Sequence, residues 1–114
     1  MNHDGVDAMI RSAIGGDADA GSWVVAHADT IDHAVLIAMA ALLERVPDRL
    51  DRAAAVAATS RDRQVVAIAR AHLTQDRDLV DALARDHLVD HPDSLIVAWI
   101  ASDAVGRARG AQGL

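Results

Sequence analysis

The chain has 114 residues, a mass of 12.0 kDa and a formal net charge of −6 at pH 7. Hydrophobic residues make up 52% and charged residues 25%, which is typical of one globular domain and excludes a disordered chain. The sequence has no cysteine, which excludes disulfides and thiol chemistry, and no lysine, which excludes a Schiff base or a Walker lysine. The negative charge argues against nucleic-acid or anionic-membrane partners. No apolar stretch approaches the ~20 residues of a membrane span and no signal peptide is recognisable, so we expect a cytoplasmic protein.

Alanine is abundant and strand-forming alternation is nearly absent, so the sequence predicts an all-α fold. In chain order, the expected helices cover residues 6–14, 22–28, 31–45, 49–58, 61–74, 77–90 and 95–109. Gly15-Gly16 ends the first of these helices, and Pro47-Asp48 separates the third from the fourth. Side chains suited to N-caps precede three of them: Ser22, Thr30, and either Thr59 or Ser60.

An internal repeat of about 30 residues is the most informative feature of the sequence. Segments 32–41, 62–71 and 92–101 each place a polar cap before three or four apolar residues, followed by alanine at matching positions. The first two segments continue through a leucine and a polar turn into a second helix, so the unit is helix–turn–helix. Because such a unit cannot bury its apolar face alone, we expect neighbouring units to stack.

Residues 71–94 resemble a tetratricopeptide repeat (TPR), because Leu88, Pro92 and Asp93 match the exit of its second helix. The resemblance covers about residues 30–108, but the spacing is near 30 rather than 34 and the usual aromatic and glycine of the first helix are missing. It implies a TPR-like solenoid or bundle of six to seven helices, arranged as stacked antiparallel hairpins. An N-terminal helical segment at 1–29 would precede the repeats at 30–109, and a frayed tail would cover 110–114.

The same resemblance implies a non-catalytic scaffold that binds a partner peptide or protein in a groove and needs no cofactor. Counting from the exit proline places four residues on the expected groove face: His72, Ile96, Trp99 and Asp103. Trp99 has two interpretations, as a core residue among alanines or as an exposed anchor for a partner. Trp23 is expected to pack the N-terminal segment onto the first repeat. An array this small and alanine-rich could also complete its core as a homodimer.

The six histidines allow another interpretation, a metal-binding helical bundle with His and Asp ligands. His87 and His91 are four residues apart, as are Asp29 and His33, and this spacing places both members of a pair on one helix face. A metal site needs three or four converging ligands, and the single glutamate, Glu44, excludes the Glu-x-x-His pattern of di-iron bundles. Surface or capping histidines are the simpler interpretation. A small regulatory or structural subunit of a larger enzyme is a third alternative.

No catalytic motif is present, so we expect no enzymatic activity. The sequence lacks the Gly-x-Ser-x-Gly elbow, and Ser22, Ser60 and Ser94 are placed to cap helices. Gly15-Gly16 lacks the spacing and the lysine of a phosphate loop. The recurrent Asp-Arg neighbours are interpreted as a solvated face with weak ion pairs.

Overall fold

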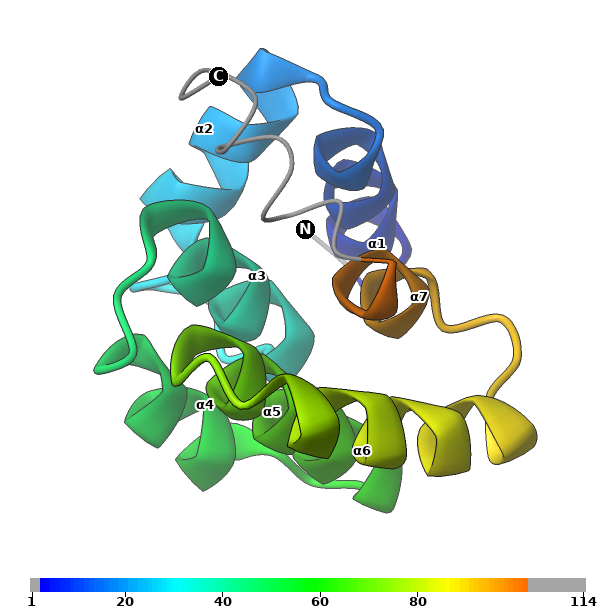
Figure 1. Ribbon diagram of the computed structural model, residues 1–114. Helices are drawn as coiled ribbons and strands as arrows, with labels where there is room; N and C mark the ends of the chain where they lie inside the picture. The colour runs from blue at the N-terminus through cyan, green and yellow to red at the C-terminus, as the bar shows by residue number, and fades with distance from the viewer. Residues whose placement is uncertain (1–2, 103–114) are drawn as a thin grey trace, which may run out of the picture.

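Seven α-helices and no strand make up the described part of the chain, residues 3–102, in the computed structural model (Figure 1). This confirms the all-α expectation. The helices are α1 (His3–Ile14), α2 (Ala18–His27), α3 (Ala34–Glu44), α4 (Arg49–Val56), α5 (Ser60–Leu73), α6 (Arg77–Asp90) and α7 (Leu95–Ala101). The bounds of α6 agree with those expected, whereas the last part of the expected helix at 95–109 lies outside the described residues. No helix within residues 3–102 is long and apolar enough to cross a bilayer.

Two of the three expected N-caps are wrong. Asp17 caps α2 by accepting two backbone N–H groups of its first turn, so Ser22 lies inside the helix. At α3 the capping group is the Nδ1 atom of His33, which accepts the N–H three residues later at 3.2 Å, and Thr30 lies before the cap. The expectation for Thr59 is confirmed, because its hydroxyl accepts the N–H three residues later at 3.1 Å. Aspartate is as good a cap as serine, and a cap nearer the true helix start was overlooked in both cases.

The turns that join α1 to α2, α3 to α4 and α5 to α6 are built alike. Each first helix ends with a residue in the left-handed conformation, namely Gly16, Arg45 and Gln75, whose φ angles are 99°, 58° and 62°. The N–H of the following residue bonds to the carbonyl five residues earlier, which is the Schellman pattern. An aspartate then precedes each second helix: the side chains of Asp17 and Asp76 cap α2 and α6, whereas Asp48 makes no side-chain cap bond to α4. The same device therefore also forms the N-terminal hairpin, which the sequence repeat did not include.

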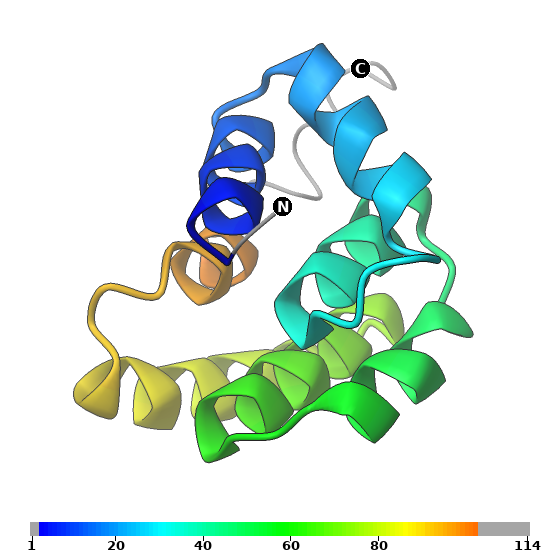
Figure 2. The same ribbon diagram turned by 180° about the vertical axis from the view of Figure 1, so that it is seen from behind.

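The four odd-numbered helices form a closed inner ring. Each of them packs against the next, and α7 packs against α1, as both views show (Figures 1 and 2). Each of α2, α4 and α6 packs across two of the inner helices. In an open solenoid the first and last inner helices lie apart, whereas here α1 packs against α7. The solenoid arrangement implied by the resemblance is therefore not confirmed. The overall extents of 35 × 34 × 26 Å agree with a closed arrangement.

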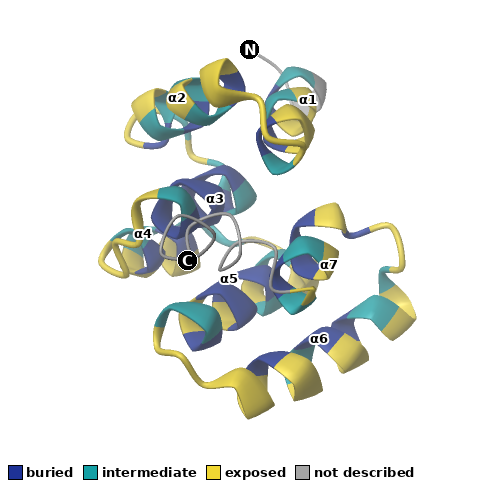
Figure 3. Cartoon of the chain, turned by 45° about the horizontal axis from the view of Figure 1, so that its top comes forward, coloured by how far each residue is buried: buried dark blue, intermediate teal, exposed yellow. Residues whose placement is uncertain are grey.

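α3 lies at the centre of the core (Figure 3). Eight of its 11 residues are buried, which explains why it is the most apolar stretch of the sequence. Four of the buried residues are alanines, whose small side chains let neighbouring helices approach closely. Trp23 and Trp99 are both partly buried and pack against this core. The ring of Trp23 stacks on the ring of His27 in the same helix, with 4.2 Å between their centroids.

Candidate functional site

A buried polar network joins α5, α6 and the start of α7. The ring of His87 on α6 lies 2.6 Å from Gln64 Oε1 on α5 through Nδ1, and 3.0 Å from Ser94 Oγ through Nε2. His87 and Ser94 are each only 2% exposed. Because the amide oxygen accepts only, Nδ1 carries the proton and donates it to Gln64, and Nε2 accepts the Ser94 hydroxyl. Both ring nitrogens are therefore satisfied.

The surroundings of His87 favour its neutral form. Burial lowers the pKa of His87 from its ordinary 6.5, and the nearby His91 and Arg61 lower this pKa further. Asp90 and Asp93 raise the pKa but are the weakest contributions. The His91 ring lies against the His87 ring, with 4.9 Å between their centroids. A neutral imidazole is the form that accepts a hydrogen bond from Ser94.

This network has the connectivity of a serine nucleophile, a base and a group that orients the base. Its burial favours a structural role instead, because a substrate would have to reach a hydroxyl that the fold covers almost completely. Ser94 occupies the N-cap position of α7, as expected, but it makes no side-chain bond to the backbone of that helix. Its hydroxyl instead bonds to His87, so it ties the α6–α7 connection to α6. No motif in the sequence indicates this, since the three residues are separated by 23 and 7 positions.

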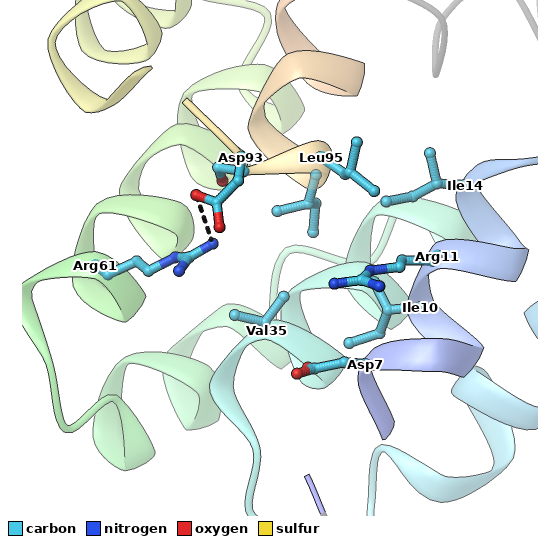
Figure 4. Close-up of a pocket in the computed structure, with 10 residues that line it drawn as sticks. Asp7, Ile10, Arg11, Ile14, Val35, Arg61, Asp93 and Leu95 are labelled. Atoms are coloured by element: carbon cyan, nitrogen blue, oxygen red, sulfur yellow. Dashed lines mark ion pairs between the residues drawn. The ribbon is translucent and has the colours of Figure 1, made fainter. Parts of the chain in front are cut away.

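A pocket opens at one end of the inner ring, and Ser94 of this network is one of its lining residues (Figure 4). We call it the end pocket. It lies where α1 and α7 meet the first residues of α3 and α5, and its volume is about 120 Å³. Its apolar wall consists of Ile10, Ile14, Val35, Leu95 and Ile96. Of these, Leu95 is 50% exposed, so the pocket presents apolar surface to solvent.

Two arginines and two aspartates form the rim of the end pocket. Figure 4 shows the guanidinium groups of Arg11 and Arg61 directed toward the pocket from opposite sides. Arg61 Nη2 lies 3.7 Å from Asp93 Oδ1, which is a long, exposed ion pair. Asp7 Oδ1 lies 3.6 Å from the Nε2 atom of His33. No carboxylate of the described residues lies within ion-pair distance of Arg11. The rim therefore holds a cation that remains available to an anionic group.

Two other pockets have no arginine among their lining residues. One of about 270 Å³ adjoins the end pocket and shares Asp7 and Val35 with it, but its charged groups are largely acidic. One of these, Asp32, is already paired with Arg52 at 2.6 Å. Another pocket, of about 380 Å³ between α2 and α3, has Glu44 as its sole charged lining residue, and that carboxylate is paired with an arginine at 2.6 Å. The end pocket alone among the three combines an apolar wall with an unpaired cation.

The residues expected to line a groove are distributed over the fold. Ile96 is buried and lines the end pocket. His72, near the end of α5, and Trp99, on α7, are partly buried and are not among the lining residues of the end pocket. Asp103 lies outside the described residues. The structure therefore places one of the four in the candidate site.

The residues considered as metal ligands each have another role. Both nitrogens of His87 are hydrogen-bonded, and His91 lies against its ring. Asp29 accepts a hydrogen bond from Arg49 Nη1 at 2.9 Å, and His33 caps α3. Within the described residues, no three histidine or acidic side chains are grouped so that they could hold a metal ion.

Comparison of the chain with protein-family models, curated protein sequences and solved structures found no match.

Proposed function

We propose that the protein is a non-catalytic protein-interaction module, whose end pocket takes up one apolar side chain of a partner protein or peptide. The observation that carries this proposal is the composition of that pocket. Apolar side chains form its wall, one of them is half exposed, and charged groups surround its mouth. Apolar anchors with a charged rim are how protein interfaces combine affinity with specificity.

The size of the pocket supports a side chain as the ligand. Its volume is about 120 Å³. Pockets for small molecules and cofactors usually measure about 300–1,000 Å³. Burying one leucine-sized side chain contributes about 1.5–3 kcal/mol, which suits an anchor within a larger contact.

The burial of the polar network supports a non-catalytic function. Ser94 has a base within hydrogen-bond distance, but its side chain and that base are almost fully covered. The bonds within the network also have a structural use, since they connect α5, α6 and α7. The repeated helical hairpins agree with the interaction role implied by the TPR resemblance.

Selection from a library of random peptides displayed on phage tests the proposal. We expect the protein to enrich peptides with an aliphatic anchor and a micromolar Kd, as judged by fluorescence anisotropy of the synthesised peptides. Leu95→Ala is expected to weaken binding about tenfold, because it removes exposed wall surface worth about 1–1.5 kcal/mol.

Leu79→Ala is the matched control, because Leu79 is a leucine of similar exposure, 43%, on α6 and does not line the pocket. Binding by this variant should equal that of the original chain. Equal losses in the two variants, or no enrichment of any peptide, would contradict the proposal.

A further inference from the structure

The end pocket needs a partner that presents an exposed apolar side chain next to a negative charge, and the chain itself carries one. Four large apolar side chains of the described residues are exposed: Val46 at 38%, Leu79 at 43%, Leu95 at 50% and Val89 at 76%. Leu95 belongs to the pocket wall. Val89, near the end of α6, is by far the most exposed of the remaining three. An apolar side chain this exposed gains most from burial in a partner.

The charges around Val89 complement the rim of the end pocket. Asp86 lies one turn before Val89 and Asp90 directly after it, and both are exposed. Neither carboxylate has an ion-pair partner within residues 3–102. On the rim, Arg11 also lacks one, and Arg61 holds its aspartate only at 3.7 Å. The two unpaired carboxylates beside Val89 are thus opposite in charge to the two arginines of the pocket rim, of which one is unpaired and the other weakly paired.

We propose that a second copy of this chain occupies the end pocket, inserting Val89 with Asp86 and Asp90 toward Arg11 and Arg61. This inference rests on the proposed function, since it uses the same pocket. The end of α6 leads directly into the connection that carries Asp93 and Ser94 of the pocket, so a chain offers the anchor and the pocket close together. A twofold axis lets the two copies exchange anchors, and the dimer then contains the contact twice.

The contact is small, and this sets the expected affinity. One anchor and a few exposed ion pairs in each half correspond to a weak, transient dimer with a Kd of about 10 µM to 1 mM. The charged pairs are exposed, so dissociation should increase with added salt. Arg85, one turn before Val89, has a counterpart in Asp7 on the rim and therefore does not oppose the contact.

A charge exchange between two variants tests the contact directly by sedimentation velocity. Arg11→Glu places an acid opposite Asp90, and Asp90→Arg places a cation opposite Arg11, so each variant alone should dimerise at least about tenfold more weakly. When the two variants are mixed, the introduced glutamate of one faces the introduced arginine of the other at one contact, and the original pair remains at the second contact. Association should then return to within about threefold of the original Kd.

Controls separate this contact from a general effect of charge. Asp78→Arg changes an exposed aspartate at the other end of α6 that takes no part in the contact, so this variant alone should dimerise with the original Kd. Val89→Ser should weaken the dimer about tenfold, whereas Leu79→Ser should leave the dimer unchanged. Variants that keep their helical circular dichroism exclude misfolding as the cause.

The inference fails if the chain remains monomeric up to about 1 mM, which is the weak limit of the expected Kd. It also fails if a dimer forms but mixing Arg11→Glu with Asp90→Arg does not restore it. Either result leaves the proposed function open, because peptides selected on phage would still bind through Leu95. Loss of peptide binding by both Leu95→Ala and Leu79→Ala would instead contradict the proposed function.

Discussion

Replacing Ser94 by alanine isolates the contribution of the buried polar network to stability. The Ser94 hydroxyl donates to His87 Nε2 and makes no bond to the backbone of its own helix. Its loss therefore removes no N-cap bond, and it leaves His87 Nε2 in the core without a donor. Tautomer exchange brings no relief, because Gln64 Oε1 requires the proton on Nδ1.

The free energy of unfolding lost in Ser94→Ala depends on how deeply His87 Nε2, the acceptor left without a donor, is buried. His87 is 2% exposed, so water cannot replace the lost donor, and a buried unsatisfied group of this kind costs about 1–3 kcal/mol. For a domain of this size, the cost corresponds to a fall in Tm of about 4–15 °C. Combining Ser94→Ala with His87→Leu removes both partners, so the double variant should lose less than the sum of the two single losses.

Urea unfolding followed by helical circular dichroism measures these differences. Ser12→Ala is the control, since Ser12 is exposed on α1 and its replacement should change the unfolding free energy by less than about 0.5 kcal/mol. A loss for Ser94→Ala as small as that of the control would refute the reasoning. Additive losses in the double variant would refute it too, because they would show that Ser94 and His87 do not interact.

Three further predictions concern single positions. Between about pH 7.5 and pH 5, the unfolded chain binds a proton at His87 more readily than the folded chain, because the folded pKa lies below 6.5. The unfolding free energy should therefore fall as the pH is lowered, and less so in His87→Gln, as urea unfolding at each pH would show. Thr59→Ala removes the observed cap of α5 and should cost about 1 kcal/mol, whereas Thr30→Ala, before the cap of α3, should cost under about 0.5 kcal/mol in the same assay. Gln75 and Gly16 both have positive φ, which glycine adopts more easily than other residues. In thermal unfolding, Gln75→Gly should therefore stabilise the protein by about 0.5 kcal/mol and Gly16→Ala should destabilise it by about 1 kcal/mol. Effects of the same sign in the two variants would contradict this.

Most of the secondary structure could be predicted from the preferences of neighbouring residues in the sequence. Alanine-rich composition, caps and breakers predicted an all-α chain, and α6 was placed at its observed bounds. The starts of α2 and α3 differ from the prediction for a local reason. Asp17 caps α2 five residues before Ser22, and His33 caps α3 three residues after Thr30. Arg45 and Gln75 show a further limit: non-glycine residues adopt the left-handed conformation that the sequence suggests only at Gly16.

The candidate site was less predictable, because it depends on contacts between segments distant in the chain. Ile96 was singled out from the repeat register, but its partners in the end pocket, Ile10 and Arg11, come from α1. Only the packing of α7 against α1 brings these segments together, and no periodicity encodes that packing. The partnership of Gln64, His87 and Ser94 was missed for the same reason, although two of the three had been considered separately, as a metal ligand and as a cap.

The network and the pocket depend on one another through α7. A helix of seven residues is too short to be stable alone, so its position must come from its contacts. Its start is held by the bond from Ser94 to His87, and Arg77 holds its end by donating to the carbonyls of Ile100 and Ala101. Between these two attachments α7 carries Leu95 on the pocket wall. Weakening either attachment should therefore reduce binding at the end pocket, as measured by fluorescence anisotropy, even though neither His87 nor Arg77 lines it.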